Sequence, residues 1–114
     1  MPDAVTSVGF VGGGQMAEAM IGGILGVELC SPESVWATDP VAARRDRLKS
    51  AFGIRVGEDN RALTGWADLV ILAVKPQVLP TVLKEIGASL AGKLVVSIVA
   101  GVPIRTLTAL APAA

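Results

Sequence analysis

Three small residues stand at an informative spacing in the stretch VGFVGGGQMAEAM, residues 8–20. Gly12, Gly14 and Ala17 fit the pattern G-x-G-x-x-G/A, in which each position has its own mechanical role. Gly12 permits a tight exit from a strand, Gly14 lets a diphosphate approach the backbone, and Ala17 lets the following helix lie close to the sheet. The spacing therefore predicts a binding site for the diphosphate of a dinucleotide.

This turn would hold an anion through the main chain. Free N–H groups at the start of the helix and the positive end of the helix dipole both favour negative charge, so no lysine is required. A P-loop would need Lys followed by Ser or Thr after its last glycine, and neither is present there. The alternative interpretation is a glycine-rich turn that only joins a strand to a helix. The flanking elements and a later acidic residue favour nucleotide binding.

Asp39 is that acidic residue, at the end of the second predicted strand. It follows Ala17 by 22 residues, close to the spacing of about 20 in the dinucleotide pattern. Its carboxylate would accept hydrogen bonds from the adenosine 2'-OH and 3'-OH groups and would repel a 2'-phosphate, which favours NAD over NADP. Alternatively, Asp39-Pro40 would be a helix N-cap followed by proline at the first helical position.

Two arginines bear on the same choice of cofactor. Arg44 and Arg45 lie one turn into the next predicted helix and could turn inward to bind a 2'-phosphate. A solvated helix face is the favoured interpretation of both side chains. The expected cofactor is NADPH or NADH, and the preference between them stays open.

Composition excludes several other classes of function. The chain of 114 residues suits one domain, and its 10 Lys+Arg balance its 10 Asp+Glu, so nucleic acid and anionic membranes are poor partners. Its apolar runs are strand-sized, far below the roughly 20 residues that span a bilayer. No basic residue precedes Arg44, and a cytoplasmic location is expected. Without histidine and with Cys30 as the single cysteine, neither a His/Cys metal site nor histidine catalysis is expected.

Compact apolar runs alternate with helical patterns along the chain. Such runs are typical of parallel strands that are covered by helices on both faces. The predicted strands are residues 5–11, 34–37, 54–56, 67–74 and 93–99. The predicted helices are residues 15–25, 41–52, 58–65, 79–90 and 104–110. The right-handed crossover rule then gives an α/β fold of Rossmann type, a doubly wound parallel sheet of order 3-2-1-4-5 in three layers, with its ligand crevice beyond the first and fourth strands.

Three stretches carry a family resemblance. GFVGGGQMA at residues 9–17, AVKPQ at 73–77 and SIVAGV at 97–102 follow one another in the order and spacing of the cofactor domain of pyrroline-5-carboxylate reductase. The sequence resembles that family over essentially its whole length. The resemblance implies hydride transfer from NAD(P)H to the C=N carbon of 1-pyrroline-5-carboxylate, which gives proline in the last step of proline biosynthesis. No side-chain nucleophile is needed for this reaction, which fits a chain without histidine.

The resemblance also implies site residues. The segment 73–77 would lie along the cofactor near its nicotinamide, and Ala100 and Gly101 would lie beneath the ring and the imine. Lys75-Pro76 could instead simply end a strand, and Ala100-Gly101 could be a plain turn. No catalytic residue and no metal ligand is assigned. The predicted cofactor-binding residues are Gly12, Gly14, Gln15, Met16, Ala17, Asp39, Ala73, Val74, Lys75, Pro76, Ala100 and Gly101.

Family members continue into a helical domain that forms the homo-oligomer and completes the imine pocket, whereas this chain ends at Ala114. We therefore expect residues 1–114 to be an NAD(P)-binding Rossmann domain whose small-molecule substrate is a cyclic imino acid, with the activity of the domain alone left open. Two alternatives stay open. One is another oxidoreductase of similar build, such as a deazaflavin-dependent NADP reductase or a hydroxyacid dehydrogenase. The other is a non-catalytic dinucleotide-binding module.

Overall fold

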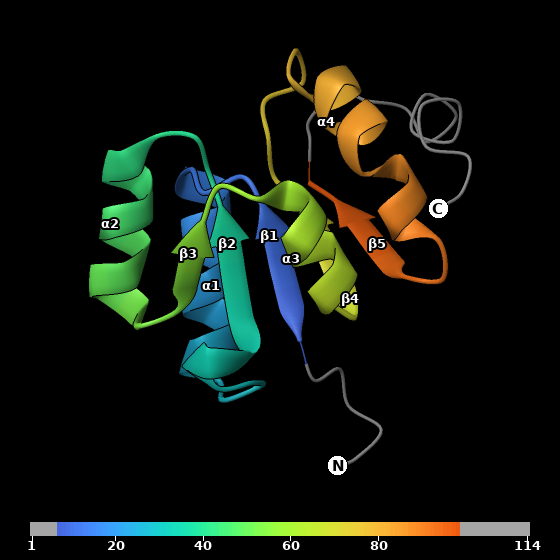
Figure 1. Ribbon diagram of the computed structural model, residues 1–114. Coiled ribbons are helices and arrows are strands. Elements are labelled where there is room, and N and C mark those ends of the chain that lie inside the picture. The colour runs from blue at the N-terminus through green and yellow to red at the C-terminus, as the bar shows by residue number, and fades with distance from the viewer. Residues whose placement is uncertain (1–6, 99–114) are drawn as a thin grey trace.

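A five-stranded parallel sheet with helices on both faces forms the domain (Figure 1). The computed structural model describes residues 7–98, so the predicted helix 104–110 and the candidate residues Ala100 and Gly101 lie outside the described residues. The strands are β1 (Val8–Val11), β2 (Val35–Thr38), β3 (Arg55–Gly57), β4 (Leu69–Leu72) and β5 (Leu94–Ser97). The helices are α1 (Gln15–Gly26), α2 (Ala42–Phe52), α3 (Asn60–Trp66) and α4 (Leu79–Ile86), with short 3-10 turns η1 (Pro32–Ser34) and η2 (Gly87–Leu90).

The predicted strand order is confirmed. The sheet runs β3-β2-β1-β4-β5, and every neighbouring pair is parallel. The central strands β1 and β2 are buried along their whole length, as their unbroken apolar sequences predict for strands covered on both faces. Strand β5 alternates between exposed and half-buried residues, because it lies at the edge of the sheet.

Two apolar clusters separate the layers. One lies between the sheet and α3 and α4, and the other lies between the sheet and α1 and α2. Helix α4 shows how the sequence directs this packing, since the buried residues Leu79, Val82, Leu83 and Ile86 follow the i, i+3, i+4, i+7 spacing of one helix face. Figure 1 shows α3 and α4 on the near face of the sheet, with α1 behind it. The predicted three-layer arrangement is therefore confirmed.

Several predicted boundaries were too generous. Strand β4 covers four residues where eight were predicted. Ala67 is not part of the strand because it is the C-cap of α3 and donates its N–H to the Leu63 carbonyl. The helix predicted at 79–90 is α-helical only to Ile86 and continues as the 3-10 turn η2, which buries Leu90. Within residues 7–98, no helix combines the length and apolarity that crossing a bilayer requires.

An ion pair joins α1 to α2 on the surface. Arg47 donates from Nε to Glu18 Oε1 at 2.6 Å and from Nη2 to Glu18 Oε2 at 2.8 Å. This two-bond geometry is the strong form of an arginine–carboxylate contact. Its hydrogen bonds lower the pKa of Glu18 below its ordinary value of 4.5, so the pair contributes stability above that pH and loses it as the pH falls through the folded-state pKa.

Replacing Glu18 with Gln tests this pair. We expect Glu18→Gln to unfold at slightly lower urea concentration than the wild type near pH 7, because the pair is exposed and exposed pairs contribute little. Well below pH 4.5, where the wild-type carboxylate is also protonated, the two proteins should unfold at the same concentration. Urea titrations at both pH values measure this, and a gap that persisted unchanged into acid would contradict the assignment.

Candidate functional site

Three strands end at the same level of the sheet and bring the candidate residues together. Val11 of β1 is in register with Thr38 of β2 on one side and with Leu72 of β4 on the other. The next residues along each chain segment are therefore Gly12, Asp39 and Ala73. The Gly12 N–H donates to the Thr38 carbonyl at 2.8 Å, and the Ala73 N–H donates to the Val11 carbonyl at 2.8 Å. These bonds fix the floor of the site at the carboxyl edge of the sheet.

Gly12 occupies a position that no other residue type fills without strain. Its φ is +105°, which L-residues rarely adopt. A Cβ atom there would lie 2.6 Å from the Ala73 carbonyl oxygen and 3.0 Å from the Val74 nitrogen. Both neighbours are backbone atoms of the segment that follows β4, so they have little freedom to move aside. The first glycine of the pattern thus allows the turn and the close approach of two strand ends.

Asp39 links the glycine turn to the segment that leads into α2. Its Oδ2 accepts a hydrogen bond from the Gly13 N–H at 2.9 Å, and its Oδ1 accepts one from the Val41 N–H at 2.8 Å. The alternative interpretation, in which Asp39 is the helix N-cap and Pro40 the first helical residue, was wrong, because α2 begins at Ala42 with Val41 as its N-cap. The carboxylate instead holds the loop before the helix against the turn.

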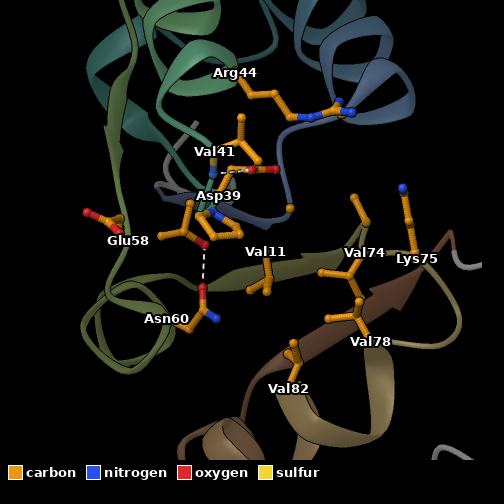
Figure 2. Close-up of a pocket in the computed structure, with 15 residues that line it drawn as sticks. Val11, Asp39, Val41, Arg44, Glu58, Asn60, Val74, Lys75, Val78 and Val82 are labelled. Atoms are coloured by element: carbon orange, nitrogen blue, oxygen red, sulfur yellow. Dashed lines mark hydrogen bonds between the residues drawn. The ribbon is translucent and has the colours of Figure 1, made fainter.

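Of the two arginines considered for the cofactor, Arg44 is exposed, as the favoured solvated face predicts, whereas Arg45 is partly buried. Arg45 donates from Nη1 to the Asp39 carbonyl at 2.8 Å, and its Nη2 lies 3.7 Å from Glu58 Oε2. The Arg45 side chain is only 20% exposed. Arg44 extends toward the glycine turn, as Figure 2 shows, and lines the cavity described next. Arg44 therefore lines the cavity while its side chain stays exposed, and Arg45 is bonded within the protein and does not line the cavity.

A cavity of about 430 Å³ opens above the carboxyl ends of β1, β2 and β4. This volume falls within the usual range for small-molecule sites. Valine side chains make much of its wall, from the end of β1, the loop before α2 and the segment leading into α4 (Figure 2). Charged groups stand at its mouth. The lining residues are Val11, Gly12, Gly14, Thr38, Asp39, Pro40, Val41, Arg44, Glu58, Asn60, Ala73, Val74, Lys75, Val78 and Val82.

Half of the twelve sequence-predicted site residues line this cavity. They are Gly12, Gly14, Asp39, Ala73, Val74 and Lys75. Gln15 and Met16 begin α1 and are exposed, Met16 at 61%. Ala17 is fully buried in the cluster between α1 and the sheet, which is the packing role that the pattern assigns to it. Pro76 is exposed and does not line the cavity.

Sequence reasoning missed two polar residues of the cavity, Thr38 and Asn60. Thr38 ends β2, and its hydroxyl donates a hydrogen bond to the side-chain oxygen of Asn60. Asn60 begins α3, three residues after β3 ends at Gly57, and its amide donates to Glu85 Oε1 at 3.0 Å. Both residues line the cavity. The signal was available for Asn60, since polar residues just beyond the carboxyl end of a parallel strand face the ligand edge of the sheet.

Some main-chain N–H groups of the glycine turn have hydrogen-bond partners within the protein, and others do not. The N–H groups of Gly12 and Gly13 are used by Thr38 and Asp39. No hydrogen bond among residues 7–98 uses the N–H groups of Gly14, Gln15 or Met16, which stand where a helix leaves its first donors without internal partners. These donors and the positive end of α1 suit an anionic group such as a diphosphate.

Metal binding and thiol chemistry have little support among the described residues. Within residues 7–98, no three side chains of the metal-binding types gather into a potential metal site. Partial burial raises the pKa of the Cys30 thiol, which lowers its thiolate fraction and its reactivity.

Comparison with known proteins places this geometry in a family context. The family described as "NADP oxidoreductase coenzyme F420-dependent" matches residues 7–101. Among curated proteins, the chain is 37% identical over 100 residues to pyrroline-5-carboxylate reductase of Synechocystis sp., covering 88% of this chain and 38% of that protein. It is 39% identical over 100 residues to the enzyme of the same name from Methanosarcina acetivorans, covering 87% and 37%.

Solved structures give the same result. A pyrroline-5-carboxylate reductase from Coxiella burnetii superposes with a TM-score of 0.88 at 28% identity, over 94% of this chain and 40% of that one. The NADP-bound pyrroline carboxylate reductase of Plasmodium falciparum gives 0.81 at 28% identity, over 93% and 38%. The chain thus spans somewhat more than a third of the length of these relatives. Because the family match covers most of its residues, the chain belongs to the family of NADP oxidoreductases described as coenzyme F420-dependent.

Proposed function

We propose that this chain binds NADPH or NADH and serves as the cofactor-binding part of a pyrroline-5-carboxylate reductase. The observation that carries the proposal is the cavity at the carboxyl ends of β1, β2 and β4, with the glycine turn and Asp39 on its floor. This is the edge at which doubly wound sheets bind dinucleotides. The likeness to reductases of that name supports the choice of reaction.

The proposed placement of the cofactor follows from the chemistry of the wall. Asp39 would accept hydrogen bonds from the adenosine ribose, and the valines would pack against the adenine. The N–H groups of Gly14, Gln15 and Met16 would meet the diphosphate. The segment Ala73 to Pro76 would direct the nicotinamide toward Ala100 and Gly101. Lys75 lines the cavity on the side away from Glu58 and Asn60 (Figure 2) and would add positive charge near that path.

The bound cofactor supplies a hydride for the C=N carbon of the cyclic imine. This chain's contribution is to bind and orient it, and no side chain of the described residues is proposed to exchange a proton with the substrate. Residues 1–114 would form one NAD(P)-binding domain, and a dimerisation and substrate region of the kind found in the family would complete the imine pocket. We also propose that the enzyme is a homo-oligomer and is located in the cytoplasm.

A second oxidoreductase function has one observation in its favour. The matching family is described by NADP and coenzyme F420 rather than by an imine. A deazaflavin-dependent NADP reductase would use the same glycine turn. The curated relatives described above favour reduction of the imine, because both are named pyrroline-5-carboxylate reductase, at 37% and 39% identity.

Binding and turnover measurements test the two levels of the proposal separately. Calorimetric titration of the chain with NADH and NADPH should show saturable binding of at least one of them, because the groups proposed to hold adenosine and diphosphate all belong to this chain. Turnover should be followed as NAD(P)H loss with 1-pyrroline-5-carboxylate in the full-length protein. Absence of heat with either dinucleotide would refute cofactor binding. Binding without imine reduction, combined with turnover of a deazaflavin, would select the second function.

A further inference from the structure

The side chain of Arg44 reaches the glycine turn itself. Its Nη1 lies 2.9 Å from the point that a Cβ atom on Gly14 would occupy. Gly14 is the residue whose bare α-carbon lets a diphosphate approach the backbone. The guanidinium group of α2 and the start of α1 therefore face the same small volume, at the mouth of the cavity that both residues line (Figure 2).

Arg44 differs from the other arginines that residues 7–98 contain. Each of the others has a partner: a carbonyl and a carboxylate for Arg45, Glu18 for Arg47, the face of Trp36 for Arg55 and the Glu85 carbonyl for Arg61. Within the described residues, the Arg44 side chain, which is exposed, makes no hydrogen bond or ion pair, and only its backbone N–H has a partner, the Val41 carbonyl. Its guanidinium is thus available for a ligand.

No carboxylate forms an ion pair with the Arg44 guanidinium among the described residues, although Asp39 and Glu58 line the same cavity. Beside it stand the first N–H groups of α1, which carry the positive end of the helix dipole. The nearby carboxylate of Asp39 is already bonded to two backbone N–H groups. A cation and a helix N-terminus repel each other unless an anion lies between them. The arrangement is therefore complementary to an anionic group that both contact.

We propose that Arg44 binds the diphosphate of the dinucleotide from the side opposite the Gly14 turn. This inference rests on the proposed function and deepens it by assigning a side-chain ligand where the glycine pattern supplies only main-chain donors. The long Arg44 side chain swings back to admit the diphosphate and then donates to its outer oxygens. Because NADH and NADPH share that diphosphate, Arg44 strengthens the binding of both equally.

A role in selecting the 2'-phosphate fits the geometry less well. The ribose is expected at Asp39, whose Oδ2 lies 3.6 Å from the Cβ position of Gly13. The tip of Arg44 lies one residue further along the turn, beside Gly14. A 2'-phosphate would also face the Asp39 carboxylate, which repels it. The place of the guanidinium beside Gly14 therefore favours the diphosphate over the 2'-phosphate.

The test compares two variants of Arg44 with a matched control on the same helix. Arg44→Gln removes the charge, Arg44→Lys keeps a point charge without the planar fork, and Lys49→Gln removes one positive charge from α2 at an exposed position away from the cavity. Calorimetry of the chain with NADH, NADPH, ADP and adenosine measures each dissociation constant. Circular dichroism checks that all the variants fold.

We expect Arg44→Gln to raise the dissociation constants of NADH, NADPH and ADP by about tenfold each, the scale of one charge-assisted hydrogen bond. Adenosine, which has no phosphate, should bind unchanged, and Arg44→Lys should lose less than Arg44→Gln. Lys49→Gln should stay within about twofold of the wild type, because screening weakens distant charges.

Each other outcome has a defined meaning. Weakening of NADPH alone would overturn the inference and assign Arg44 to the 2'-phosphate. Unchanged binding of all ligands would overturn it while leaving the proposed function standing. Wild-type binding of ADP without either dinucleotide, lost in Arg44→Gln, would refute the proposed function but support the diphosphate contact. No binding of any phosphate ligand by the wild type would overturn both.

Discussion

Gly12→Ala should lower the free energy of unfolding by about 3 kcal/mol or more. The added Cβ meets the Ala73 carbonyl oxygen at 2.6 Å, and the φ of +105° is strained for alanine. Backbone strain of this kind costs roughly 1–3 kcal/mol, and overpacking against immobile atoms adds a similar amount. Urea unfolding followed by tryptophan fluorescence measures the loss. Dinucleotide binding should fall with it, since relief of the clash separates the ends of β1 and β4.

The control for this variant is Gly23→Ala in the middle of α1. A Cβ at Gly23 meets nothing within 4 Å, and alanine favours the helix over glycine by roughly 0.5–1 kcal/mol. Gly23→Ala should therefore stabilise the protein while Gly12→Ala destabilises it. If both substitutions changed stability by the same amount and sign, the close contact between Gly12 and Ala73 would be refuted.

Asp39→Ala should weaken NADH binding by at least about tenfold and destabilise the protein by about 2 kcal/mol. The stability loss follows because the buried Gly13 N–H and the Val41 N–H both lose their acceptor, and an unpaired buried donor costs roughly 1–3 kcal/mol. The binding loss follows because the ribose hydroxyls lose the same carboxylate. NADPH should lose less affinity than NADH, since the repulsion of its 2'-phosphate disappears together with the charge.

Asp46→Ala provides the matched comparison for Asp39→Ala. Asp46 lies on an exposed position of α2, so its removal changes the net charge equally without touching the turn. Calorimetry with both dinucleotides, at urea concentrations far below unfolding, separates binding from stability. Equal losses for NADH and NADPH in Asp39→Ala would contradict a ribose contact. A similar loss in Asp46→Ala would attribute the effect to charge alone.

The sequence predicted the strand order correctly, and it named residues that the structure brings together around one cavity, for identifiable reasons. Unbroken apolar runs indicate parallel strands, and handed crossovers leave few possible orders for five of them. Gly12 was predictable because a positive φ and a close backbone contact both require glycine. Asp39 was predictable because the end of β2 must lie next to the end of β1 in that order.

Side-chain orientation on α2 could not be predicted in the same way. Leu48 is the only fully buried residue among the eleven of α2, so the sequence of this helix carries too weak an amphipathic pattern to show which of its arginines face the cavity. The bond from Gly13 to Asp39 joins residues 26 apart and depends on a rotamer that no local pattern encodes. The same holds for the pairing of Thr38 with Asn60, which needs β2 and β3 in their final register.

The common level at which β1, β2 and β4 end also has a thermodynamic consequence. Contacts of Gly12 with Thr38 and Ala73 join segments that meet only when three strands have paired, so an unfolded chain holds no part of this pocket. Because the proposed dinucleotide would bind only the folded domain, its concentration would shift the folding equilibrium. A ligand at a hundred times its dissociation constant would add about 2.7 kcal/mol to the free energy of unfolding. Depletion of the proposed dinucleotide, in both its oxidised and its reduced form, would therefore leave a larger fraction of the domain unfolded and open to proteolysis.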